Sequence, residues 1–195
     1  GMGVESVHDI MVATSRLAAK FYRSGTVEAH LDLLGLWLRR YGRPHALYTD
    51  RHSIFEPQDK GKALPEGVTQ FGRALAELDI DLIRAHSPQA KGRVERSFGT
   101  AQDRWVKELR LAKARTLEAA NAVLEQLVPD HNRRFGRIAR QPTDAHRRLG
   151  PCHRLESILS IQTERVVSND YVVRFANRFY QLLPPAYPGE RGGRV

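Results

Sequence analysis

Short apolar strands alternate with amphipathic helices between residues 26 and 85, and this alternation restricts the possible folds more than any other feature. The spacing of apolar residues predicts a helix over 27–41, a buried strand over 45–50, a helix over 68–78 and a strand over 79–85. Strands joined by a crossover helix pair in parallel, and the crossover is right-handed. We therefore expect a parallel pair whose carboxyl ends share one sheet edge, where α/β proteins place functional groups.

Further helices and strands extend this unit on both sides. Residues 10–22 predict one or two strands with a turn near 13–15. Helices are predicted over 91–113 and 116–134, and Pro129 is expected to kink or split the second of them. The chain is therefore expected to form a mixed α/β domain with flanking helices.

The sequence becomes rich in arginine after residue 135 and then changes character again beyond Pro151. A short helix is predicted over 143–149, a brief helix after Pro151, and two or three short strands over 163–183. This change predicts two units. The first is an α/β core over residues 2–150, and the second is a linker helix with a small partial β module over residues 151–195.

The composition favours an anionic partner. Lysine and arginine number 31 against 22 acidic residues, which gives a formal net charge of +9 and a pI near 10.1. Such an excess suits nucleic acid, although a solvated basic surface without a ligand is an equally good explanation of charge alone. The single cysteine excludes an internal disulfide and a cysteine-cluster zinc site. The sequence lacks a long apolar run and a secretory leader, so we expect no membrane partner and a cytoplasmic, nucleoid-associated location.

Two acidic residues are candidates for a metal site. Asp50 ends a predicted buried strand, and Glu95 lies in a predicted basic helix 45 residues later. Each has an ordinary structural explanation, because an aspartate can cap a turn and a glutamate can pair with a lysine one helical turn away. Together they offer the hard oxygen ligands that select Mg²⁺ or Mn²⁺. We therefore expect Asp50 and Glu95 to be catalytic and metal-binding residues.

Two basic clusters are candidate DNA contacts. The first surrounds Glu95, and the second follows the predicted helix that ends near residue 134. The residues expected to bind phosphate are Lys91, Arg93, Arg96, Arg133, Arg134 and Arg137. For the second cluster the alternative explanation is a solvated connector.

Several long motifs resemble the catalytic core of insertion-sequence transposases in the retroviral integrase superfamily. They are LYTDRHSIF at 47–55, SPQAKGRVERSFGTAQDRWVKELR at 87–110, DHNRRFGR at 130–137 and RVVSNDYVVRFANRFYQL at 165–182. The resemblance implies a ribonuclease-H-like fold and an Asp, Asp, Glu triad that holds two Mg²⁺ ions for phosphoryl transfer on DNA. Asp50 matches the second aspartate of that triad, and Glu95 matches its glutamate.

The resemblance also implies a first catalytic aspartate, on a strand for which this sequence offers no match. Asp9 is the only aspartate of the N-terminal segment. It stands four residues before Ala13, much closer to the matching segment at 12–16 than the family's first aspartate does. We therefore expect a transposase fragment, truncated at the N-terminus and also at the C-terminus, that binds metal weakly and is inactive or nearly so on its own.

The alternative reading is a non-catalytic DNA-binding relic or a regulator of transposition. A purely structural or oligomerisation domain is a third reading. Without the first strand the sheet is expected to expose an edge that could pair in a homo-oligomer such as a dimer.

Overall fold

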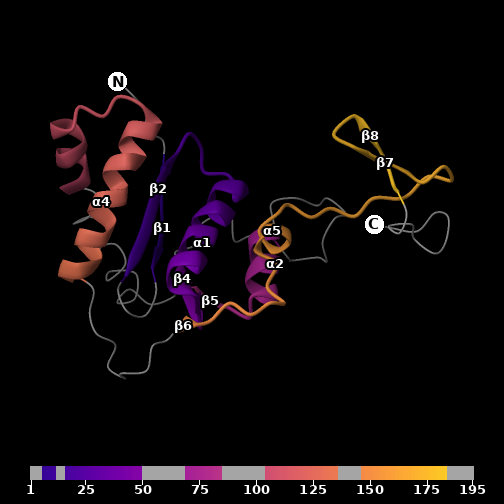
Figure 1. The fold of residues 1–195 in the computed structure, drawn as a ribbon, viewed down its shortest axis with the longest axis horizontal. Helices are drawn as coiled ribbons and strands as arrows, with labels where there is room; N and C mark the ends of the chain where they lie inside the picture. Colours follow the sequence, from indigo (N-terminus) through magenta and orange to yellow (C-terminus); the bar gives the residue numbers. More distant parts are fainter. Residues whose placement is uncertain (1–5, 12–15, 50–68, 85–103, 136–145, 184–195) are drawn as a thin grey trace.

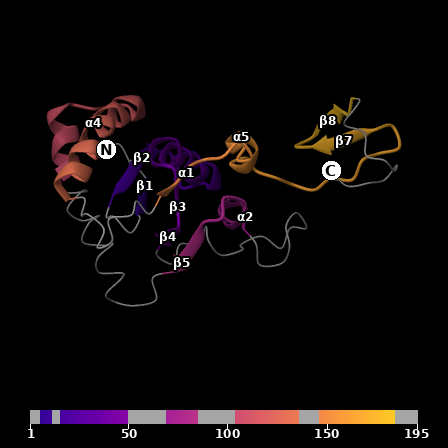
Figure 2. The same ribbon diagram turned by 60° about the horizontal axis from the view of Figure 1, so that its bottom comes forward.

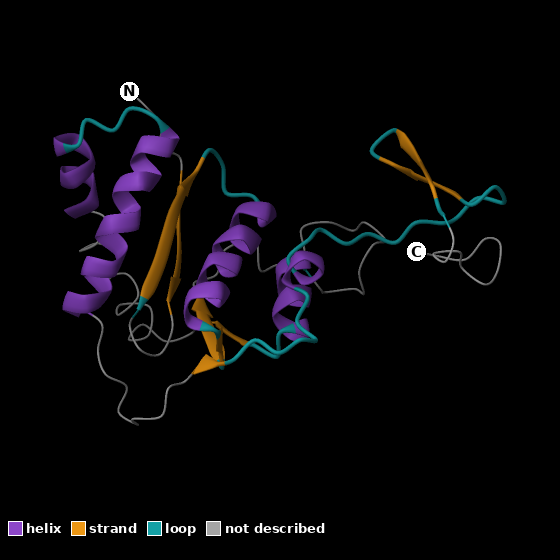
Figure 3. Ribbon diagram, viewed as in Figure 1, coloured by secondary structure: helices purple, strands orange, loops and turns teal. Residues whose placement is uncertain are grey.

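The computed structural model describes residues 6–11, 16–49, 69–84, 104–135 and 146–183, and these form a mixed α/β structure with small sheets and several helices (Figure 1). Figure 3 shows the helices lying along the strands of the main sheet. None of the helices in this described part is both long and apolar enough to cross a membrane.

The main sheet has four strands in the order β2-β1-β4-β5. Their bounds are Ser6–Met11 for β1, Leu17–Tyr22 for β2, Ala46–Thr49 for β4 and Asp81–Arg84 for β5. Strands β1 and β2 form an antiparallel hairpin over six residue pairs, and β4 and β5 pair in parallel over four. The parallel pair predicted from the sequence is confirmed. Two N-terminal strands are also found, but the first begins at Ser6, before the predicted range of 10–22, and the turn predicted near 13–15 lies outside the described residues.

The hairpin and the parallel pair meet at a single point. Among the described residues, strand β1 pairs with β4 at one position, Met11 with Tyr48, in antiparallel orientation. Within the described part of the sheet, β1 therefore occupies the position beside β4, and the outer strands are β2 and β5. The contact of β1 with β4 is a single residue pair, so the expectation of an exposed sheet edge that could pair between two chains stays a prediction.

Helix α1, Val27–Tyr41, begins and ends where its capping residues predict. The Thr26 side chain accepts a hydrogen bond from the Ala29 amide, and Gly42 follows the last turn with a φ of 83°. The buried face of α1 includes Leu34 and Trp37, which have no exposed surface. This face packs on the sheet, as the 3.6-residue period of apolar positions requires.

Helix α2, Gln70–Glu77, follows the same rule and lies beside α1. Its N-cap is Thr69, whose hydroxyl accepts a hydrogen bond from the Gly72 amide at 3.0 Å. Phe71 and Leu75 are buried in the same apolar cluster as the inner face of α1. Helices α1 and α2 therefore cover one face of the sheet with a common core.

A second apolar cluster covers the other face. It joins Leu17 and Phe21 of β2 to Trp105 in the helical segment 104–111 and to Leu124 of α4, Leu117–Phe135. Leu17 and Phe21 point to this side because alternate residues of a strand share a face. Strand β2 is thus covered on both faces, which Figure 1 shows as α4 and α1 lying on either side of β2.

Helix α4 continues through Pro129, so of the two predicted effects, a kink or a split, the split is wrong and the kink stays a prediction. A proline removes the hydrogen bond to the carbonyl four residues earlier, which belongs to Glu125. Glu125 is exposed, so water can satisfy that carbonyl, while Val128 and Leu124 hold the buried face against β2. Packing of the buried face therefore outweighs the local defect.

Two asparagines of α4 bind the outer edge of β2 through paired hydrogen bonds. Asn132 accepts from the Leu17 amide at 2.9 Å and donates to the Leu17 carbonyl at 2.8 Å. Asn121 makes the same pair of bonds with Phe21, at 2.8 and 3.1 Å. A side-chain amide presents one acceptor and two donors, so it can replace a neighbouring strand at one residue. Helix α4 therefore closes the edge of the sheet at these two points.

The predicted short helix over 143–149 is wrong at its described residues. Strand β6, His146–Arg147, is extended and pairs antiparallel with β3, Arg43–Pro44. The Arg147 guanidinium also donates to the carboxylate and the carbonyl of Asp79. Backbone pairing with a distant segment, reinforced by this ion pair, favours the extended form over the local helical pattern.

The last described elements are α5, Leu155–Ile158, and a hairpin of β7, Val172–Phe175, and β8, Arg178–Gln181. Ala176 and Asn177, at the turn, both have positive φ, as a two-residue hairpin turn requires. The brief helix and two of the predicted strands are confirmed. Figures 1 and 2 show the hairpin standing apart from the helices of the core.

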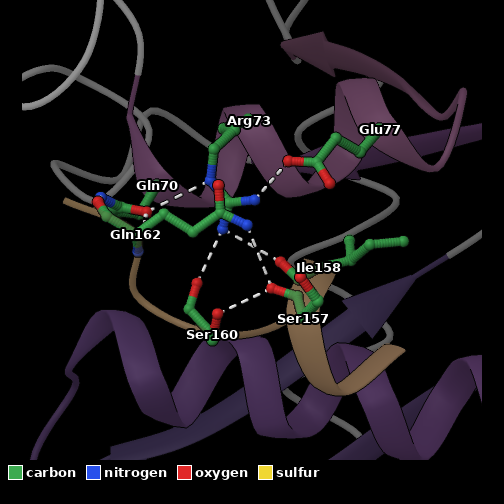
Figure 4. A network of polar contacts seen from close by, with 7 residues as sticks. All are labelled: Gln70, Arg73, Glu77, Ser157, Ile158, Ser160 and Gln162. Atoms are coloured by element: carbon green, nitrogen blue, oxygen red, sulfur yellow. Dashed lines mark hydrogen bonds and ion pairs between the residues drawn. The ribbon is translucent and has the colours of Figure 1, made fainter. Parts of the chain in front are cut away.

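A polar network fastens the segment after α5 to α2 (Figure 4). The Arg73 guanidinium donates to the carbonyls of Ile158 and Ser160, at 3.0 and 2.7 Å. The Gln70 side chain accepts from the Gln162 amide at 3.1 Å and donates to its carbonyl. The connection to the β7–β8 hairpin thus starts from a fixed point on the core.

Candidate nucleic-acid interface

Most of the residues singled out from the sequence lie outside the described part of the chain. They are Asp50, Lys91, Arg93, Glu95, Arg96 and Arg137. In the sequence, Asp50 comes directly after Thr49, the last residue of β4. The described residues contain no group of three or more His, Cys, Asp or Glu side chains that could hold a metal ion. The metal site and the first basic cluster therefore stay predictions.

Arg133 and Arg134 are the two predicted DNA contacts that the structure describes. They lie in the last turn of α4, and 78% and 56% of their side-chain surfaces are exposed. Cations are favoured there because the free carbonyls give a helix C-terminus a partial negative charge. Both guanidinium groups are therefore available at the surface, although neither is a free charge.

Asp130 binds three arginines at once. Its carboxylate accepts hydrogen bonds from Arg133 at 2.5 Å and from Arg134 at 3.1 Å. It also accepts one from Arg104, at 2.7 Å. We call Arg104, Arg133, Arg134 and Asp130 the arginine cluster. Three positive charges surround one negative charge in this cluster, so it keeps a positive excess that can attract an anion.

The hydrogen bonds from the arginines determine the charge state of the acid. The Arg104 bond contributes most to lowering the pKa of Asp130 below its usual range; desolvation opposes this effect, while the Arg133 and Arg134 bonds reinforce it. Asp130 is therefore ionised at neutral pH. Because this pKa is lowered, protonation weakens the cluster only as the pH falls through the acidic range.

Arg104 reaches Asp130 because the neighbouring residue is part of the core. Trp105 is 2% exposed and packs in the cluster beneath α4. Its ring lies 6.1 Å from that of His131, which in turn lies 4.8 Å from Phe135. These contacts fix the segment 104–111 against α4 and bring Arg104 close to Asp130.

His131 is buried in this contact with only 3% of its surface exposed. Burial is the main reason that its pKa is lowered, and the positive charge of Arg104 acts in the same direction. The imidazole is therefore neutral at neutral pH. It serves the packing between the two helices and adds no charge to the arginine cluster.

Arg104 was not identified as a candidate from the sequence. Asp130, Arg133 and Arg134 show the i, i+3 and i, i+4 spacing that predicts ion pairs on a helix. Arg104 precedes Asp130 by 26 residues on another helix, and no local spacing connects them. The only local signal was that Arg104 directly precedes Trp105. Trp105 stands four residues before Leu109, which is the spacing of residues on one face of a helix.

Comparison with known proteins gives two relatives and no matching family model. The chain is 38% identical over 172 residues to a putative transposase, y4bF, of Sinorhizobium fredii. It is 34% identical over 187 residues to the transposase for insertion sequence IS1202 of Streptococcus pneumoniae. These matches cover 87% and 92% of this chain, which spans only 38% and 37% of the two relatives. The curated relatives of this chain are thus proteins named transposases.

Proposed function

We propose that this chain is a segment of a DNA transposase with an integrase-type, ribonuclease-H-like core. The observation that carries the proposal is identity of 34–38% over most of the chain to two proteins named transposases. The parallel pair of β4 and β5, with α1 and α2 on one face of the sheet and α4 against β2 on the other, is compatible with such a core. The position of Asp50 directly after β4 agrees with a catalytic acid at the carboxyl edge.

In this proposal Asp50 and Glu95 hold divalent metal. Carboxylate oxygens are the donors that Mg²⁺ and Mn²⁺ prefer, so the chemistry of this pair fits the ion. Bound metal would supply Lewis-acid stabilisation of the phosphoryl group that is transferred. The contribution of the chain itself is to present two negative charges from two different segments. The sequence provides only two of the three acids that the family resemblance implies.

We therefore expect the polypeptide on its own to have little or no DNA cleavage or strand-transfer activity. The assay is strand transfer with Mg²⁺ or Mn²⁺ on the ends of the insertion sequence that encodes the chain. Robust activity that is lost in Asp50→Asn would contradict this expectation. Titration of Mn²⁺ followed by electron paramagnetic resonance tests the site separately. Weak binding that disappears in Glu95→Gln supports the assignment, whereas unchanged binding in that variant contradicts it.

The arginine cluster supports DNA binding independently of catalysis, which is also what a non-catalytic relic or regulator would require. We expect the chain to bind duplex DNA in a salt-dependent manner, and Arg133→Ala with Arg134→Ala to weaken that binding. Each lost phosphate contact should reduce the slope of log K against log salt by about 0.9. Fluorescence anisotropy on a labelled duplex measures this slope.

Arg154→Ala with Arg165→Ala is the matched control for this experiment, because it also removes two positive charges. Both residues are exposed, and they lie away from α4: Arg154 precedes α5, and Arg165 lies between α5 and β7. An equal loss of affinity in both variants would mean that only the total charge matters. A loss confined to the α4 variant supports DNA contact at the arginine cluster. Light scattering on the same samples tests the expectation that the chain forms a homo-oligomer such as a dimer.

A further inference from the structure

We propose that Asp130 is a positioning residue, which holds Arg104, Arg133 and Arg134 together as one binding site for a single backbone phosphate. The inference rests on the proposed DNA function and adds two residues, Arg104 and Asp130, to it. It also gives the acid a role opposite to the one its charge suggests. A negative residue on a DNA-binding surface is expected to repel DNA, whereas here it organises the groups that bind.

Within the described residues, the hydrogen bonds to Asp130 use only some of the donors of the three arginines. A guanidinium group carries about five N–H donors in a planar fork. Asp130 accepts from one nitrogen of each arginine, namely Nη2 of Arg104, Nη2 of Arg133 and Nε of Arg134. The remaining donors can bind a second anion. A phosphate oxygen suits them, because arginine binds phosphate through paired hydrogen bonds.

The exposure of the four side chains places the acid beneath the arginines. Only 17% of the Asp130 side chain is exposed, against 78% for Arg133, 56% for Arg134 and 29% for Arg104. An anion that approaches from solvent therefore meets the guanidinium groups before it meets the carboxylate. The positive excess of the cluster more than balances the single charge of one backbone phosphate.

The cluster joins two helices, which gives it a fixed geometry. Arg104 is held next to buried Trp105, and Arg133 and Arg134 are held on α4. Without Asp130 the three side chains would repel one another and sample separate rotamers. With Asp130 in place they are already together before DNA arrives, so binding loses less side-chain freedom.

Asp130→Asn separates this inference from simple electrostatics. The variant removes one negative charge at nearly constant volume, so a surface that acts only through its net charge must bind DNA more tightly. We expect the opposite: roughly three- to tenfold weaker binding to a labelled duplex and a salt slope lower by about 0.9. Asp32→Asn is the matched control. It makes the same charge change on α1, where Asp32 pairs with Lys20 at 2.7 Å.

Arg104→Lys is the second variant, because it keeps the charge and loses the planar fork. We expect it to weaken DNA binding as Asp130→Asn does, with circular dichroism showing that both variants are folded. Tighter or unchanged binding by folded Asp130→Asn would overturn the inference and leave the proposed DNA function intact. Unchanged binding by Arg104→Lys would overturn the role of that residue.

Inorganic phosphate tests the proposed anion site independently of the proposed DNA-binding function. We expect phosphate to shift the Nε–Hε signals of the cluster arginines in nuclear magnetic resonance spectra, and to do so less in Asp130→Asn. This shift without any duplex binding would contradict the proposed function while supporting the anion site. Duplex binding without a shift that depends on Asp130 would contradict the site alone.

Discussion

Replacing Asn132 by alanine should destabilise the protein far more than the loss of one polar side chain suggests. The substitution removes both bonds to the Leu17 backbone, at 2.9 and 2.8 Å, and leaves an amide and a carbonyl without a partner at the edge of β2. A polar group left unsatisfied in a buried position costs about 1–3 kcal/mol. Because these bonds are only partly buried, we expect a total loss of about 2–4 kcal/mol. This is a large part of the roughly 5–15 kcal/mol that stabilises a domain.

Urea denaturation followed by tryptophan fluorescence measures this loss, because Trp105 lies in the apolar cluster beneath α4. Asn132→Asp has almost the same volume but cannot donate to the Leu17 carbonyl, so it should cost at least as much as alanine. Asn169→Ala, at an exposed turn, is the control and should change stability by less than about 0.5 kcal/mol. A loss below about 0.5 kcal/mol for both Asn132 variants would refute the reasoning.

Three further predictions concern other parts of the structure. Gly42→Ala should cost about 1–3 kcal/mol in urea denaturation, because φ is 83° and a Cβ would lie 2.6 Å from the Arg147 carbonyl; unchanged stability would contradict this. Arg73→Met should speed proteolytic cleavage after α5 by releasing the Ser160 carbonyl, and an unchanged rate would argue against the network of Figure 4. Wild-type stability should fall as the pH drops below about 6.5, because the unfolded state binds a proton that buried His131 resists. In His131→Gln this part of the pH dependence should shrink, and an unchanged pH profile would exclude His131 as its source.

Elements with local signals were predictable from the sequence. Helices α1 and α2 begin at Thr26 and Thr69 because a hydroxyl there can accept from an amide of the first turn. The parallel pairing of β4 and β5 follows from the helix between them. These predictions succeed because capping and periodicity act over a few residues, and nothing distant opposes them.

Features that depend on distant contacts were not predictable. Residues of β6 adopt a strand because Arg43 pairs with Arg147, which no local pattern reveals. The same limit applies to the candidate site, since Arg104 and Asp130 come together only after two helices have packed. Asp50 and Glu95 were identified through the motifs around them, and their roles stay predictions.

The hydrogen bonds between α4 and β2 help to fix the register of the β1–β2 hairpin. In a strand, successive residues turn their backbone groups to opposite edges, so only alternate residues can face an outer partner. Leu17 and Phe21 are four residues apart and therefore face the same way, toward Asn132 and Asn121. If β2 slipped by one residue against β1, both asparagines would meet the wrong backbone groups and both apolar side chains would change face. Docking of α4 thus favours the observed register of the hairpin over registers that are shifted by one residue.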